Sequence, residues 1–341
     1  MARKILGGIP PLRFGEGREC SFPASLAAAT KTEYDWVMGC SGTAFEARID
    51  ERTWDPLAAT PRDDATLARG AAAVGVRLDV VTPPFDDDMR ELVFERVKEQ
   101  IGGGVPPLAR GLVGAPVYGH FVGYELARAD RGGLPPRTHE RRSTSEAKYD
   151  DAGPTFLART YFDRGVEPTR VGWEAFVDAD HGTPVFLDPA PKPDRGRAAL
   201  AGIDAGLASA DATEAALRSW SAGLRDDARW ADAKHAGAAA FADHSMRTVL
   251  ADKRRSAARF LRGLRSEFPT RPGADLLRAA ESYGYVVDLA AKQGVGAFDA
   301  SVAMRFADAG HRRGWANALE AAIGHEREAI TALRAAREAL G

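Results

Sequence analysis

The composition of the chain changes near residue 195, and this change limits the folds open to it. Before that point, prolines and glycines interrupt short apolar runs; after it, Ala, Leu, Arg, Asp and Glu dominate, and most of these residues favour helices. The segment Pro189–Pro193 lies at the transition, where its prolines remove backbone donors and favour extended structure in the residues before them. The sequence therefore predicts two domains, over residues 1–194 and 195–341.

The first domain carries both helical and strand patterns. Apolar residues at helical spacing, or acidic residues at a helix start, predict helices over 21–30, 63–74 and 86–101. Alternating or apolar runs predict strands over 76–81, 107–113, 117–126, 155–162 and 185–187. Elements in this order, joined by long connections, indicate an α+β domain. The polar segment 127–153 is interpreted as a disordered excursion, with a functional lid as the alternative.

The pattern of the second domain predicts an all-α helical bundle. Apolar residues recur near helical spacing over 240–264, 274–291 and 325–340. The short breaks at 269–273 and 294–296 suit connections between neighbouring helices.

Charge and cysteine content exclude several classes of protein. Lys and Arg total 46 against 48 Asp and Glu, so the chain lacks the basic balance that is typical of nucleic-acid binding. Cys20 and Cys40 are the only cysteines, which rules out a disulfide scaffold and a zinc site of several thiolates.

No run resembles an export signal or a membrane span, so we expect a cytoplasmic protein that does not interact with membranes. No stretch has the spacing of a phosphate loop, a dinucleotide site or a metal site, so no cofactor is predicted.

Cys20 is the candidate nucleophile. It follows the glycine-containing run Gly15–Glu19 and precedes the predicted helix over 21–30, which places its thiol at a helix N-terminus. Unpaired backbone N–H groups and the helix dipole favour a thiolate at such a position. The alternative is a small buried residue that packs the helix start. Cys40, in a run of small residues, is interpreted as a packing residue.

A cysteine nucleophile needs a base, and His120 is the best candidate. It lies in the strand pattern 117–126, and a strand histidine about a hundred residues after a helix-capping cysteine is typical of papain-type arrangements. The alternative is a half-buried strand histidine with a backbone partner. A third group has to orient the imidazole. Asp163 follows the next predicted strand, which is the order expected for the orienting residue, and Asp188 is the second choice. For both aspartates, the alternative is a structural role in a turn.

The N-terminal part resembles the papain-like domain of the butirosin biosynthesis protein H type. The likeness is carried by the Cys20 segment, 34–45 (YDWVMGCSGTAF), 54–56 (WDP), 111–116 (GLVGAP) and 123–125 (GYE), in that order. The C-terminal domain is similar to the helical extension of uncharacterised bacterial relatives, through 254–261 (RRSAARFL). The resemblance implies a papain-like fold and a Cys–His acyl-transfer site. In the named member, an acyl group moves from a carrier protein to an aminoglycoside amine.

One feature departs from papain-type peptidases, which place a Gln shortly before the cysteine to help stabilise the oxyanion. This chain has only Gln100 and Gln293, which disfavours a peptidase more than an acyltransferase. The backbone N–H of Cys20 remains as a candidate oxyanion donor.

We therefore expect a cysteine-dependent acyltransferase or an amide or thioester hydrolase, with a role in secondary metabolism as one setting. Cys20 attacks the carbonyl, His120 exchanges the proton and Asp163 orients His120; the partner is a small-molecule or carrier-bound acyl substrate. Two alternatives stay open. One is an inactive papain-like protein that binds a small molecule or peptide, and the other is a scaffold that binds a partner through the helical domain. The sequence leaves the oligomeric state open.

Overall fold

The structure is a computed structural model. It describes residues 2–60, 63–126, 155–163, 165–172, 181–265, 267–268, 270–298 and 300–340. The chain forms two compact units. Residues 1–12 and 78–188 make up the first unit, and residues 13–77 and 189–341 make up the second. The second unit is therefore discontinuous in sequence, because the chain leaves it after Arg77 and returns at Pro189.

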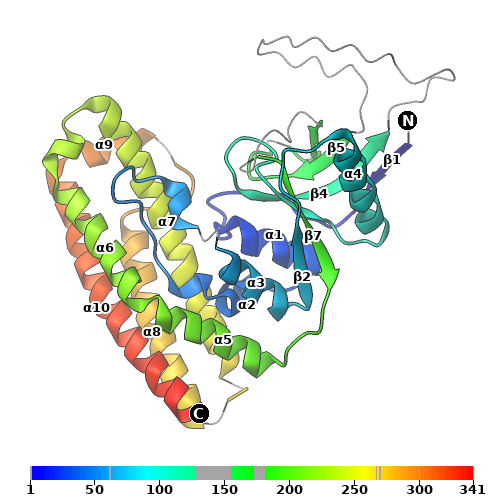
Figure 1. The fold of residues 1–341 in the computed structure, drawn as a ribbon. Coiled ribbons are helices and arrows are strands. Elements are labelled where there is room, and N and C mark those ends of the chain that lie inside the picture. Colours follow the sequence, from blue (N-terminus) through cyan, green and yellow to red (C-terminus); the bar gives the residue numbers. More distant parts are fainter. Residues whose placement is uncertain are drawn as a thin grey trace. The chain divides into compact units, whose positions relative to one another are not determined.

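An antiparallel sheet forms the frame of the first unit (Figure 1). Within the described residues its strand order is β2-β7-β3-β4-β5-β6, with β1 paired to β4. The strands are β1 (Ala2–Ile5), β2 (Val76–Val80), β3 (Leu108–Arg110), β4 (Tyr118–Leu126), β5 (Thr155–Arg159), β6 (Thr169–Val171) and β7 (Thr183–Pro189). The first residues of β2 belong to the second unit, so this strand spans the point where the chain leaves it.

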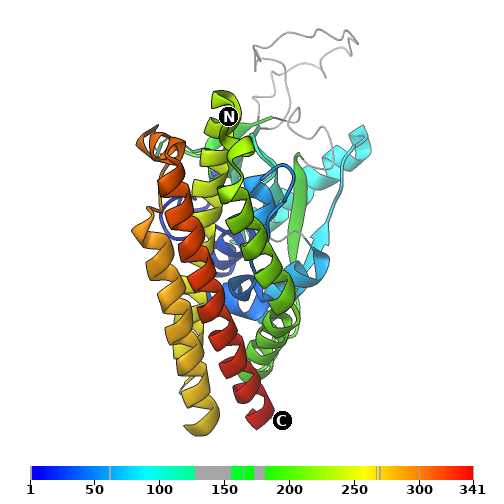
Figure 2. The same cartoon turned by 90° about the vertical axis from the view of Figure 1, so that its left-hand side faces the viewer.

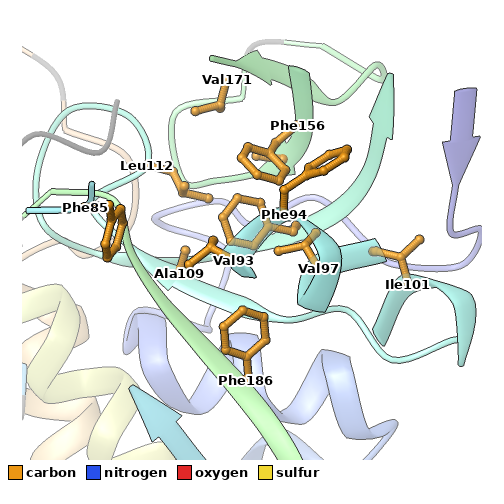
Figure 3. Close-up of a cluster of buried hydrophobic side chains, with 12 residues drawn as sticks. Phe85, Val93, Phe94, Val97, Ile101, Ala109, Leu112, Phe156, Val171 and Phe186 are labelled. Atoms are coloured by element: carbon orange, nitrogen blue, oxygen red, sulfur yellow. The ribbon is translucent and has the colours of Figure 1, made fainter. Parts of the chain in front are cut away.

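One face of the sheet is covered by helix α4 (Asp87–Gly102). Asp86 caps the helix by accepting the Met89 N–H, and two further aspartates in the first turn suit the positive end of the helix dipole. Figure 3 shows the core that results, in which side chains of α4 meet side chains of the strands. Its members include Val93, Phe94, Val97 and Ile101 from α4, and Ala109, Phe121, Phe156 and Phe186 from the sheet. Burial of this apolar surface fixes α4 on the sheet.

The second unit is helical. Its elements are α1 (Ser21–Thr30), α2 (Tyr34–Ser41), α3 (Asp64–Ala73), α5 (Arg195–Ala208), α6 (Ala210–Arg225), α7 (Ala233–Leu264), α8 (Thr270–Lys292), α9 (Ala300–Ala307) and α10 (Ala309–Leu340), with short turns of 3-10 helix at 43–45, 56–59 and 227–230. Helix α8 packs against both α7 and α10, and α10 also packs against α6 (Figures 1 and 2). None of the helices described is both long enough and apolar enough to cross a membrane.

Helix α2 and the short helix at 43–45 pack directly on the long helix α7. Gly39 of α2 faces the ring of Phe260 of α7, because a Cβ at Gly39 would lie 2.2 Å from that ring. Trp36 and Phe45 also contact the Phe260 ring, with centroids 5.7 and 6.1 Å away. Helices far apart in the sequence therefore share one core.

The predicted class, a mixed α and β chain with a helical C-terminal part, is confirmed. The helices predicted over 21–30, 63–74 and 86–101 are present as α1, α3 and α4. Two long helices begin earlier than predicted, α7 at Ala233 and α10 at Ala309. The predicted strand over 155–162 ends at Arg159, because the next residues form a turn. The papain-like arrangement and the domain boundary near residue 194 stay predictions, and the segment 127–153 lies outside the described residues, as part of 127–154.

Candidate functional site

Cys20 occupies the predicted position at the start of a helix. It is the N-cap residue of α1, with extended backbone angles, and its carbonyl accepts the first helical hydrogen bond from the Ala24 N–H at 3.0 Å. The preceding loop turns at Gly15 and Gly17, whose φ angles of 91° and 84° are left-handed. Glycine adopts this conformation at no steric cost, which explains the glycine-containing run before the cysteine.

The carboxylate of Glu19 closes this loop. It accepts the Gly15 N–H at 2.7 Å and the Gly17 N–H at 2.8 Å, and the Glu19 residue is buried. Burial raises the pKa of Glu19 to about 7, although the two backbone donors act in the opposite direction; the neighbouring carboxylate of Asp252 raises it further.

Asp252 of α7 holds the same loop from the other side. Its Oδ2 accepts the Glu19 N–H at 2.9 Å and the hydroxyl of Tyr34 at 2.6 Å. The Tyr34 oxygen in turn accepts the Cys20 N–H at 3.2 Å. We call Glu19, Tyr34 and Asp252 the Cys20 clamp. The Cys20 N–H, the candidate oxyanion donor, therefore already donates to a side chain of the protein.

The Cys20 thiol is fully buried, with 0% of the residue exposed. Burial raises its pKa; Lys253 acts in the opposite direction, and the carboxylates of Asp252, Glu46 and Glu19 raise it further. The Lys253 ammonium is shared, because its Nζ lies 3.4 Å from a Glu46 oxygen. Burial is the largest of these effects, and a buried residue is the alternative that the sequence left open for Cys20.

His120 lies on β4, within the strand predicted for it, and is fully buried. It pairs in register with Leu108 of β3 and Arg159 of β5, and Leu108 pairs with Val185 of β7. Residues paired across strands share a face, while sequence neighbours point to opposite faces. Since Phe121 belongs to the core under α4, His120 lies on the other face of the sheet.

Asp163 stabilises a turn. Its Oδ1 accepts the hydroxyls of Thr160 and Thr169 at 3.2 and 2.8 Å, and its Oδ2 lies 3.5 Å from the guanidinium of Arg159. These contacts join the end of β5 to the start of β6. The turn role, which the sequence left open for this residue, is therefore observed.

Asp188, the second choice as orienting group, lies near the end of β7. Its side chain approaches α4, with Oδ1 3.8 Å from Nη2 of Arg96. By the alternation of β7 it shares the α4 face with Phe186, whereas His120 belongs to the opposite face. The geometry within the first unit therefore does not favour Asp188 as the partner of His120.

The predicted catalytic residues are divided between the two units. Cys20 belongs to the second, and His120, Asp163 and Asp188 belong to the first. The catalytic triad therefore stays a prediction. Cys40 is buried within α2, as expected for a packing residue. The described part of the chain holds no group of three or more His, Cys, Asp or Glu side chains placed to bind a metal ion.

Sequence reasoning missed the Cys20 clamp. Glu19 and Tyr34 both lie in segments that carry the family resemblance, but neither was assigned a role. Asp252 lies in a helix far along the chain, where an aspartate facing the core has no distinguishing pattern in a single sequence.

Comparison with known proteins adds no assignment. No family model matches the chain, and no curated protein matches it either.

Proposed function

We propose that the protein is a cysteine-dependent enzyme that transfers an acyl group to an amine or to water, with Cys20 as nucleophile and His120 as its base. The observation that carries this proposal is the Cys20 clamp. Burying carboxylates is costly unless they are paired or hydrogen-bonded, and two of them, Glu19 and Asp252, are used here to fix one short backbone segment. This free-energy cost is expected where chemistry requires a precisely held backbone geometry.

The proposed reaction is a two-step acyl transfer. The sulfur of Cys20 attacks the carbonyl carbon of a thioester or amide, while the thiol proton passes to a ring nitrogen of His120. The imidazolium then returns the proton to the leaving thiol or amine as its bond to the acyl carbon breaks. An amine or water next attacks the acyl-enzyme and restores the Cys20 thiol. The third catalytic residue is left unassigned, because Asp163 already serves the turn after β5.

A second function is favoured by a specific observation. Buried cysteines with raised pKa values are usually inert, and Cys20 is fully buried. The function that this burial favours is that of a papain-like protein without catalysis, which binds a small molecule or a peptide.

Acyl capture separates the two functions. The full-length protein with Cys40→Ser is incubated with a panel of acyl thioesters of N-acetylcysteamine, and adducts are mapped by mass spectrometry. We expect an acyl adduct on Cys20, formed about a hundred-fold more slowly when His120→Ala removes the proposed base. The matched control is Cys20→Ser with Cys40 intact, which should form no adduct. A folded protein that forms no adduct with any donor would support the non-catalytic function.

A further inference from the structure

A cavity of about 560 Å³ lies within the second unit, between the segment 52–56 and the segment 226–242. Its volume is that of a site for a small organic molecule, since such sites usually measure about 300–1,000 Å³. Among the described residues that line it there is neither Cys20 nor a member of the Cys20 clamp. The cavity is therefore a second candidate site, separate from the proposed nucleophile.

Trp54 forms a fixed wall of this cavity. The residue is 2% exposed, and its ring lies edge to face with the ring of Trp230, with centroids 6.0 Å apart. Its φ of 52° is left-handed, a conformation that costs free energy in a bulky residue. Close packing holds the indole there, because a Cβ at Gly223 would lie 2.4 Å from its Cζ2 atom. The motif 54–56 thus places a rigid indole beside the cavity.

Arg229 lies over this indole with part of its donor set unused. Its guanidinium carbon is 4.6 Å from the centroid of the Trp54 ring, and its Nη2 donates to the carbonyl oxygen of Glu51 at 3.0 Å. Among the described residues, its buried Nε has no hydrogen-bond partner and its guanidinium has no carboxylate in an ion pair. A buried donor without a partner is costly, and a guanidinium binds a carboxylate through two parallel N–H groups. Arg229 is therefore suited to an anionic group of a ligand.

The other charges of the cavity favour a ligand with a single negative charge. Arg52 adds a second guanidinium, whereas Asp55 and Asp226 add two carboxylates. These carboxylates act as caps, because their Oδ1 atoms accept the N–H groups of Leu57 and Ala228 at 2.9 and 3.1 Å. They would nevertheless repel a doubly charged phosphate monoester more strongly than a singly charged carboxylate.

Helix α7 supplies an apolar wall. His235, Ala238, Ala239 and Ala242 follow the spacing i, i+3, i+4 and i+7, so they lie on one face of the helix, and the three alanines leave room beside it. Phe241 also lines the cavity and is 47% exposed. We propose that the cavity binds a small organic acid, whose carboxylate pairs with Arg229 and whose apolar body lies along α7.

Calorimetric titration of the full-length protein with matched probes tests this inference. The acids are benzoate, phenylpropionate and octanoate; the amide, the amine and the phosphate monoester of similar length change only the head group of each. At neutral pH we expect at least one acid to bind, and its amide, amine and phosphate analogues to bind about tenfold more weakly or not at all. Equal binding of the amide, tighter binding of the amine or the phosphate, or no binding of any acid would overturn the inference.

The variant Arg229→Gln locates the carboxylate. It removes the charge and the two-pronged donor, so the affinity for the acid should fall about tenfold or more, while the weak binding of the amide should not change. The matched control is Arg225→Gln at the end of α6, where the side chain is exposed, donates to Asn317 and does not line the cavity. Equal weakening by both variants would mean a general effect of charge and would refute the role of Arg229.

The variant Ala238→Trp locates the apolar body and keeps the inference testable if Arg229→Gln does not fold. Ala238 is exposed on α7 and lines the cavity, so an indole there should fill the space and abolish binding. Ala233→Trp, at an exposed position of the same helix outside the cavity, should bind the acid as the parent does. Binding that survives Ala238→Trp would place the acid elsewhere and overturn the inference. These measurements involve no cysteine, so their outcome and that of acyl capture are independent.

Discussion

Glu19 shows how a single buried side chain links loop geometry to pH. Its carboxylate is held by two backbone donors, yet burial beside Asp252 makes its ionisation unfavourable. An acid whose pKa is higher in the folded than in the unfolded state binds more protons when folded. Its contribution to folding therefore weakens as pH rises between the two values.

Replacement of Glu19 by Gln makes this pH dependence measurable. Between its ordinary value of 4.5 and its folded value of about 7, ionisation of Glu19 should cost the parent about 3 kcal/mol that the variant does not lose. The stability of the parent minus that of the variant should thus fall from pH 4.5 to pH 7 and then level off. Urea unfolding of both proteins at four pH values tests this, and the variant serves as the control for every other titrating group. A constant difference would contradict it.

At the scale of residues, the sequence predicted the element in which a residue lies better than it predicted the surroundings of its side chain. The place of Cys20 before α1 and of His120 on β4 followed from local patterns, because glycines, helix starts and strand alternation are encoded within a few neighbouring residues. The sequence left open whether Cys20 is a reactive or a buried residue, because the burial that raises its pKa depends on contacts between segments distant in sequence, such as that of Glu19 with Asp252.

At the scale of elements, close helix contacts in the second unit depend on glycines. Helix α5 crosses α2 at Gly202, where an added Cβ would lie 2.1 Å from the carbonyl oxygen of Gly39. No rotamer relieves a clash with backbone, so the two helices would have to separate.

Gly202→Ala should therefore destabilise the protein by about 2 kcal/mol. The matched control is Gly324→Ala on α10, where a Cβ meets nothing within 4 Å and where alanine should stabilise the helix by about 1 kcal/mol. Thermal and urea unfolding of the two variants should give shifts of opposite sign. Shifts of the same sign would mean that helix propensity, and not the close crossing, decides the effect.

A buried polar junction joins three of the long helices. Asp243 of α7 accepts the indole N–H groups of Trp220 on α6 and Trp315 on α10, at 2.8 and 3.0 Å, and pairs with Arg247 at 2.7 Å. Both members of the ion pair are fully buried. The junction is therefore sensitive to the loss of one partner.

Asp243→Ala should cost about 3–5 kcal/mol, because it leaves the Arg247 charge and two indole N–H groups buried without their acceptor. The double variant Asp243→Ala/Arg247→Met should lose less than the single variant, since no unpaired charge remains. A double-mutant cycle by urea unfolding measures this coupling. Additive losses would show that the two residues act independently.

The sequence predicted most of the long helices but missed α5 and α6, which are 14 and 16 residues long. Apolar periodicity indicated α4, α7, α8 and α10, because each presents several turns to a core. The strands β1 and β6, four and three residues long, were missed because neither lies in a longer apolar run, whereas the equally short β3 lies within the predicted run 107–113. Helix α2 was not predicted, although its residues carry part of the resemblance, because a helix of eight residues that is buried on almost all sides shows no polar face.

At the scale of the whole molecule, the second unit is interrupted by the first. The chain leaves and re-enters it at adjacent points: the Gly75 carbonyl accepts the Ala190 N–H at 2.9 Å, and a Cβ at Gly75 would lie 3.2 Å from Cβ of Lys192. Composition alone predicts a boundary near residue 194, because the residue types before and after it differ. It does not detect that α2 and α3 pack with helices from beyond that boundary.

This arrangement predicts how the chain can be divided. Replacement of residues 78–188 by a short Gly/Asn linker should leave a protein with a helical far-UV spectrum and one cooperative unfolding transition, because its ends are already neighbours. The fragment 195–341 should fail to unfold cooperatively, because Phe260 loses its contacts with Trp36 and Phe45 and Asp252 loses those with Tyr34 and Glu19. If the fragment instead folds cooperatively and the linked protein does not, the boundary near residue 194 is the physical one, and the helices before it do not belong to the same folding unit as α7.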